Sequence, residues 1–310
     1  MFFAGFFEPK AFNEGYLPEA DGHSVYFAEY GNPKGTPLLT THGGPGGGGC
    51  KPRYLQGINL KKYRVIMLDQ RGCGKSTPAG EMKNNSMEDT LFDFKRLLDY
   101  LNIKEKVVLK GGSWASTVML MFAERYPKQV KKMVLSQVFL ADKMNDDWIL
   151  EQSSLFYPDV MEKIKAEVHG WRTIPETYAE LINSRKPEEQ KKAVSLFGNY
   201  ERVLGNFDVE QEAGDLDDKA LASNRIYLNY FAKNFTLKSN EIMRNVKKIA
   251  DIPALIVHNR LDFVCPLKNA YDLHKAMPNS KLVIVPEKGH VGTLLYKTLK
   301  RETADFLAED

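Results

Sequence analysis

The chain has 310 residues, of which 43% are hydrophobic and 27% are charged, and its formal net charge at pH 7 is +3. This balance excludes an intrinsically disordered chain and a membrane-embedded one, because it combines enough apolar residues for a core with an ordinary proportion of charges. The lysine pairs are scattered rather than gathered into a basic stripe, so we expect no nucleic-acid partner. No apolar run reaches membrane-spanning length, so we expect no membrane partner either.

The amino-terminal residues and the cysteines predict the compartment. Residues 1–10, MFFAGFFEPK, lack the basic start, the long apolar stretch and the cleavage site of a signal peptide. Cys50, Cys73 and Cys265 are too few and too irregularly spaced for a disulfide framework or a zinc site, which predicts free thiols and no metal. We therefore expect a cytoplasmic protein. The oligomeric state stays open.

Short apolar runs bounded by turn residues alternate with helical patterns along most of the chain. Before them, the first 35 residues alternate as antiparallel edge strands do. Near-continuous apolarity is typical of parallel strands that helices cover on both faces. The runs predicted as such strands are 36–42, 63–69, 106–110, 130–136, 252–258 and 280–286.

Two helices are predicted between these strands. Ser86 can cap the first together with Asp89, and apolar residues recur after it at positions 91, 94, 98 and 101. The second is predicted over 114–126 and is ended by Pro127.

The alternation of strands and helices stops after Leu140. From 141 to 245 helical periods and clustered charges replace it, which predicts a helical cap inserted between two strands of one sheet. The predicted fold class is therefore α/β, with a mostly parallel, doubly wound sheet. Residues 1–140 and 246–310 would form the catalytic domain and residues 141–245 the cap.

The segment GGSWAST, residues 111–117, follows one of the apolar runs directly. A serine presented on a strained turn between a strand and a helix needs very small neighbours. The segment matches a nucleophile elbow, G-x-S-x-G, with Ala115 in the last glycine position. Ser113 is therefore the candidate nucleophile.

An acid and a histidine follow two later apolar runs. Asp262 follows 252–258 and His290 follows 280–286, so both are predicted at the edge of the sheet where Ser113 lies. Serine catalysis needs a base to accept the hydroxyl proton and a carboxylate to orient that base. The chain order serine, aspartate, histidine fits this arrangement. Cys265, three residues after Asp262, is expected near the site, whereas the role of His258 stays open.

The glycine-rich run HGGPGGGG, residues 42–49, also follows a predicted strand. It has the arrangement of neither a Walker loop nor a dinucleotide-binding loop, which argues against a phosphate site. We expect it to donate a backbone N–H, that of Gly44, to an oxyanion hole completed by the N–H of Trp114. His42 is expected to organise this loop.

Five segments together resemble the proline iminopeptidase family of α/β-hydrolases. They are HGGPGGG at 42–48, DQRGCGKS at 69–76, GGSWAST at 111–117, NRLDFVCP at 259–266 and KGH at 288–290. The resemblance implies an α/β-hydrolase fold and a triad of Ser113, Asp262 and His290. It also implies an enzyme that needs no cofactor. This enzyme would remove an amino-terminal residue, preferably proline, from short peptides, and other small amides or esters are further expected substrates.

The resemblance implies a substrate pocket as well. Glu201, after an aromatic residue in the cap, stands where the family has a glutamate for the substrate amine. Tyr227 stands where the family has a second acid, so this chain departs from the family there. Phe139 would face the proline ring. An exposed surface role for Glu201 and a core role for Phe139 are alternatives.

Two other functions stay open. A carboxylesterase or amidase could use the same triad, and Tyr227 favours it because an ester needs no partner for an ammonium group. A ligand-binding protein on a hydrolase fold is the alternative outside enzymes, and the complete set of candidate catalytic groups argues against it.

Overall fold

The predicted strands form one eight-stranded sheet in the computed structural model, which describes residues 9–207 and 216–309. The strands lie in the order β1-β2-β4-β3-β5-β6-β7-β8. The first two pair antiparallel, as expected from the amino-terminal alternation, and β3 to β8 are parallel. The predicted α/β class with a mostly parallel sheet is confirmed. The strands are β1 (Asn13–Tyr16), β2 (Tyr26–Gly31), β3 (Thr36–Thr41), β4 (Tyr63–Leu68), β5 (Val107–Gly112), β6 (Val130–Ser136), β7 (Ala254–Leu261) and β8 (Ser280–Lys288).

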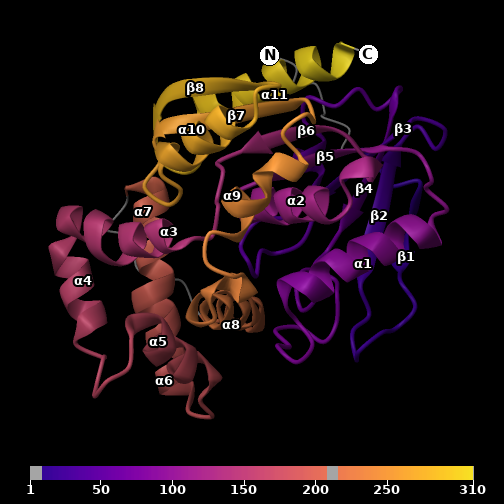
Figure 1. The fold of residues 1–310 in the computed structure, drawn as a ribbon. Helices are drawn as coiled ribbons and strands as arrows, with labels where there is room; N and C mark the ends of the chain where they lie inside the picture. The colour runs from indigo at the N-terminus through magenta and orange to yellow at the C-terminus, as the bar shows by residue number, and fades with distance from the viewer. Residues whose placement is uncertain (1–8, 208–215, 310) are drawn as a thin grey trace, which may run out of the picture.

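Helices cover both faces of the sheet (Figure 1). Successive side chains of a strand point to opposite faces, so neighbours such as Val108 and Leu109 belong to different hydrophobic clusters. The cluster with Leu109 packs against α1, α2 and α10, and the cluster with Val108 packs against the short 3₁₀ helix η1 (Pro52–Leu55) and α11. The helices of these layers are α1 (Met87–Tyr100), α2 (Trp114–Arg125), α10 (Leu267–Ala276) and α11 (Thr293–Ala308).

The two predicted helices begin and end close to their expected residues. Ser86 caps α1 by accepting from the backbone of Asp89, whose carboxylate accepts from the Ser86 backbone in return. The apolar face predicted from positions 91, 94, 98 and 101 packs into the core. Helix α2 begins at Trp114 and ends two residues before Pro127.

The segment predicted as the cap is helical wherever the structure describes regular elements in it. Figure 1 shows these helices gathered on one side of the molecule, away from α11. The boundaries of the cap stay a prediction, because its buried side chains belong to the same hydrophobic cluster as those of α1 and α2. The helices are α3 (Lys143–Asp147), α4 (Pro158–Lys165), α5 (Ile174–Asn183), α6 (Pro187–Ala193), α7 (Asn199–Asn206), α8 (Asp218–Ala232) and, at its end, α9 (Glu241–Asn245).

Within the two described ranges, none of the helices has the combination of length and apolar character needed to traverse a bilayer.

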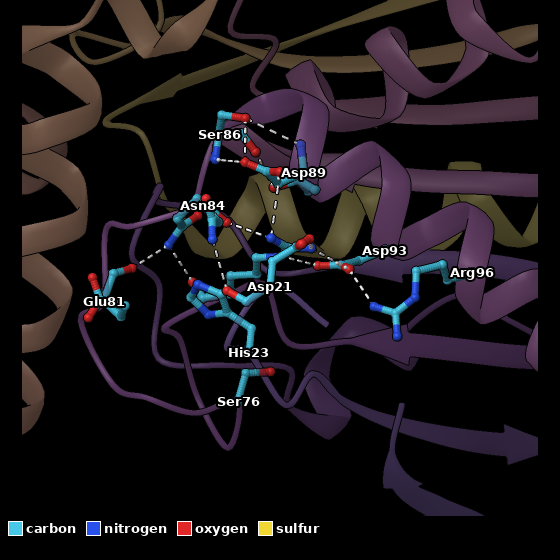
Figure 2. Close-up of polar contacts among 12 residues, drawn as sticks. Asp21, His23, Ser76, Glu81, Asn84, Ser86, Asp89, Asp93 and Arg96 are labelled. Carbon is cyan, nitrogen blue, oxygen red and sulfur yellow. Dashed lines mark hydrogen bonds and ion pairs between the residues drawn. The ribbon is translucent and has the colours of Figure 1, made fainter. Parts of the chain in front are cut away.

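A buried arginine anchors the loop that carries the motif DQRGCGKS. Arg71 is 1% exposed and donates to both carboxylate oxygens of Asp93, at 2.6 and 3.0 Å. It also donates to the backbone of Asn84 and to Asp21. Figure 2 shows Asp21, Asn84 and Asp93 close together, from separate loops and from α1. A buried cation with several charge-assisted hydrogen bonds holds its surroundings firmly. The adjacent residue, Gln70, is thereby fixed against the site.

Candidate active site

Ser113 lies at the sharp turn between β5 and α2, as predicted. Its backbone has φ 58° and ψ −136°, a region that residues other than glycine rarely adopt, so the turn is strained. The glycines before it are sterically required. A side chain at position 111 would collide with the carbonyl of Ala115, and one at position 112 would come within 2.5 Å of the Ser136 hydroxyl.

Ser113, His290 and Asp262 are hydrogen bonded in series. The Ser113 Oγ lies 3.0 Å from His290 Nε2, and His290 Nδ1 lies 2.8 Å from Asp262 Oδ2. A carboxylate can only accept, so Nδ1 carries the proton and Nε2 is left to accept from the serine hydroxyl. The three side chains come from the carboxyl ends of β5, β7 and β8, where the sequence placed them.

The second oxygen of Asp262 is also occupied. Asp262 Oδ1 accepts from the backbone N–H groups of Val264 and Cys265, at 2.9 Å each, and the side chain is buried. These bonds fix the carboxylate that faces the histidine. The other acid after a strand, Asp69, instead accepts from the backbone of Cys50 at 2.6 Å and of Lys75 at 2.9 Å, so it organises loops.

His258, whose role the sequence left open, is buried beside this carboxylate. Its Nδ1 accepts from the Val138 N–H at 3.0 Å and its Nε2 donates to the Cys265 carbonyl at 2.8 Å. Burial lowers the pKa of His258, although Asp262 opposes this effect. A neutral ring with both nitrogens paired inside the protein is a structural group that shapes the loop of Asp262.

The opposing influences on His290 leave it more basic than usual. Burial alone would lower its pKa, but the carboxylates of Asp262 and Glu201 act in the other direction and the pKa is raised. Two hydrogen bonds hold the backbone of the loop that carries His290. Gln137 Nε2 donates to the His290 carbonyl at 2.6 Å, and the His290 N–H donates to the Gly205 carbonyl at 2.9 Å. Sequence reasoning did not find Gln137, which has no local signal of such a role.

The glycine run is packed against Ser113 and is tied to Trp114 through Gln70. His42 Nε2 accepts from the Gln70 N–H at 3.1 Å and its Nδ1 donates to the Gly43 carbonyl at 2.8 Å, so His42 organises the loop as expected. The Gln70 side chain donates to the His42 carbonyl and accepts from the Trp114 indole, both at 2.8 Å. Gln70 therefore joins the two segments expected to supply oxyanion donors, a role that the sequence did not reveal.

The two expected oxyanion donors come from the glycine run and from the start of α2. Trp114 is the first residue of α2, so its backbone N–H has no acceptor within the helix. Gly44 has a φ of 127°, which disfavours any residue with a side chain, and it lines the cavity at Ser113. Both positions are compatible with donation to an anion at Ser113.

A cavity of about 450 Å³ opens at Ser113 and contains the Glu201 side chain. Glu201 lies on α7, is half-buried and is one of the residues that line this cavity. Burial raises the pKa of Glu201 to about 7, although His290 and the Tyr227 hydroxyl act in the opposite direction. The half-buried position of Glu201 in the cavity wall argues against the surface alternative, and its role as an amine ligand stays a prediction.

Neither Tyr227 nor Phe139 is among the described residues that line this cavity. Tyr227 is 6% exposed, and its hydroxyl interacts with the Glu201 carboxyl. Phe139 is 5% exposed and packs edge-to-face against Phe235 at 5.0 Å between ring centroids. The position of Phe139 favours the core alternative, and its contact with a proline ring stays a prediction.

Cys265 lies next to the site, as expected from its spacing. Its side chain interacts with Ser113 and is 1% exposed, and burial raises the pKa of the thiol well above its ordinary value. A protonated, buried thiol reacts slowly with alkylating reagents.

The comparisons with known proteins agree with this fold. The α/β-hydrolase fold family matches residues 36–295. A probable proline iminopeptidase of Leptolyngbya boryana is 34% identical over 90% of this chain and 88% of its own length, and a proline iminopeptidase of Arabidopsis thaliana is 35% identical over 91% and 76%. Among solved structures, a putative aryl esterase from Burkholderia cenocepacia covers 96% of this chain and 98% of its own with a TM-score of 0.62, at 17% identity, which shows the shared fold.

The chain is thus an α/β-hydrolase. Within that class it belongs to the proline iminopeptidase family, and the family predicted from the five motifs is confirmed.

Proposed function

We propose that this protein is a serine aminopeptidase in which Ser113, His290 and Asp262 form the catalytic triad. The observation that carries the proposal is the series of hydrogen bonds from the strained serine through the histidine to the buried carboxylate. His290 Nε2 accepts the Ser113 proton as Oγ attacks the scissile carbonyl, and Asp262 holds the tautomer that this transfer needs. His290 then protonates the leaving amine. Water releases the acyl residue from Ser113 in a second, analogous step.

The developing oxyanion would accept from the backbone N–H groups of Gly44 and Trp114. Such donors act most strongly when they are held in place before the reaction. The hydrogen bonds of Gln70 to both segments support this role, because they fix the glycine loop relative to α2.

Glu201 would bind the free amine of the substrate. An ammonium group entering a partly desolvated cavity needs a counter-charge, and Glu201 is the one acidic side chain among the described residues that line this cavity. The substrates would be short peptides with an amino-terminal residue, preferably proline, which is the activity that the names of the relatives give to those proteins. The three cysteines are free, which supports a cytoplasmic location.

A carboxylesterase or amidase activity is the second candidate. The observation that favours it is the position of Tyr227, which leaves a single carboxyl, with a pKa of about 7, to face an ammonium group. A neutral ester would need no such partner.

Parallel assays test both functions. A proline-linked chromogenic amide and a short-chain aryl ester would be offered to the wild type and to Ser113→Ala. If the wild type cleaves the amide and Ser113→Ala does not, the result supports the aminopeptidase. Turnover of the ester alone would establish the second candidate, and turnover of neither would contradict both.

A further inference from the structure

The cavity at Ser113 continues past the nucleophile into a region lined by four basic side chains. Lys51, Arg53, Lys110 and Lys300 line this region, which we call the basic arm. Lys110 lies on β5, Arg53 on η1 and Lys300 on α11, and Lys51 directly precedes η1. Glu201, by contrast, lies on α7. Figure 1 shows α11 on the opposite side of β7 and β8 from α7. The cavity is therefore acidic on the cap side and basic on the side of η1 and α11.

Lys110 forms the floor of the basic arm. It lies three residues before Ser113 on β5, is 8% exposed, and points to the same face of the sheet as Val108. Its Nζ donates to the Tyr54 carbonyl at 2.7 Å, and burial lowers the pKa of this lysine to about 8. An ammonium group has three donors and is costly to bury without a counter-ion. An anion in the cavity would supply that counter-ion.

The other three cations are exposed around the mouth of the arm. Arg53 packs over the Tyr54 ring, with its guanidinium 5.3 Å from the ring centroid, while Lys51 and Lys300 stand nearby. Across residues 9–207 and 216–309, the structure gives no ion pair to any cation of the basic arm. Four cations around one cavity, without an ion pair in the described part of the chain, create a positive potential that favours an anionic ligand.

We propose that the basic arm binds a carboxylate on the leaving group of the substrate. The inference rests on the proposed function: with the substrate amine at Glu201 and the scissile carbonyl at Ser113, the leaving amine extends away from the cap. A short peptide with both termini free then places a positive charge at Glu201 and a negative one in the basic arm. The carboxylate is either the carboxyl terminus of a dipeptide or an acidic side chain directly after the scissile bond.

Pairs of substrates that differ in one charge test the proposal. Prolylglycine is compared with prolylglycinamide for a terminal carboxylate, and Pro-Asp-NH2 with Pro-Asn-NH2 for a side-chain carboxylate, by measuring the release of free proline. The charged member of at least one pair should have a kcat/KM about tenfold higher or more, as expected for a charge-assisted hydrogen bond. The pair that shows the difference identifies the source of the carboxylate.

Lys300→Met and Arg53→Met should each reduce this ratio, and Lys110→Met should bring it close to one. Lys297→Met is the matched control, because Lys297 is an exposed lysine of α11 outside the cavity and its loss should leave the ratio unchanged. The two surface variants keep the test valid if Lys110→Met fails to fold. Equal rates within both pairs, or ratios that none of the three variants alters, would overturn the inference.

A binding measurement separates failure of this inference from failure of the proposed function. Calorimetry on Ser113→Ala compares the affinities for prolylglycine and prolylglycinamide, and for the second pair, without any turnover. Tighter binding of a charged member supports the basic arm even if the wild type cleaves none of the four. Equal binding contradicts it even if all four are cleaved.

Discussion

The backbone N–H of His290 donates a hydrogen bond to the Gly205 carbonyl at 2.9 Å. Gly205 belongs to α7, the helix that also carries Glu201. One helix therefore bonds the backbone of the candidate general base and carries the candidate amine ligand. Gly289 fits closely against the same carbonyl, since a side chain there would come within 2.9 Å of it. A movement of α7 would therefore change substrate recognition and the position of His290 together.

Replacing the nucleophile should remove almost all activity. In Ser113→Ala, kcat on the proline-linked amide should fall by about 10³-fold or more, because only binding and the oxyanion donors would remain. Steady-state assays and a thermal unfolding curve measured in parallel check this. Activity near the wild-type level on every substrate would mean that Ser113 is not the nucleophile.

Asp262→Asn should impair His290 as a base, although the new side chain has nearly the same size. The amide would stabilise the wrong tautomer of His290, and kcat should fall by about 10³- to 10⁴-fold with a smaller change in KM. Asp251→Asn is the matched control, since Asp251 is an exposed acid outside the site. Similar losses in both variants would refute the assignment of Asp262.

Glu201→Gln should separate amine recognition from chemistry. A charge-assisted hydrogen bond to an ammonium contributes about 1.5–3 kcal/mol, so kcat/KM on the proline amide should fall about ten- to a hundredfold. The aryl ester has no ammonium group, and its turnover well above neutral pH should change little. Equal losses on both substrates would assign Glu201 a structural role in the cap.

The same variant should also shift the pH dependence of ester hydrolysis. The Glu201 carboxylate contributes to the raised pKa of His290, so its removal should lower that pKa. The base acts when it is neutral, and activity is lost as pH falls through its pKa. The acidic limb of the kcat/KM profile should therefore move to lower pH in the variant. An unmoved limb, measured between the same pH limits in wild type and variant, would argue against this coupling.

The sequence predicted the fold and the series Ser113, His290 and Asp262 because these features depend on local patterns. Buried parallel strands are continuously apolar, and each candidate residue directly follows such a run. The strained turn at Ser113 could be predicted for the same reason, since its glycines are adjacent in the chain. The catalytic roles of these residues stay a prediction.

The remaining parts of the site depend on contacts between distant segments. Gln70 meets Trp114, and Gln137 meets His290, only after the sheet has brought their loops together. Lys110 is a charged residue at the end of a strand in the sequence, and it is buried because η1 covers that face. The edge-to-face contact of Phe139 with Phe235 likewise joins residues far apart in the chain, so no local pattern could show it.

A buried acid outside the site should set part of the pH dependence of stability. Glu124 on α2 is 7% exposed, and its carboxyl oxygens have no hydrogen-bond partner among the described residues. Burial raises the pKa of Glu124 to about 8 from a usual value of 4.5, although Lys248 opposes the effect. The folded state therefore retains a proton that the unfolded state loses. The contribution of this group to stability is greatest at acidic pH and declines as pH rises toward 8.

Glu124→Gln should remove this dependence because the amide does not ionise. At pH 5 the free energies of unfolding of wild type and variant should be similar, and by pH 8 to 9 the variant should be more stable by about 1–3 kcal/mol, the cost of a buried unpaired group. Denaturant unfolding at several pH values measures the difference. Glu19→Gln, at an exposed glutamate, should follow the wild type throughout. If the curves of Glu124→Gln and wild type stay parallel from pH 5 to 9, the Glu124 carboxyl is already ionised in the folded protein and another group must neutralise it.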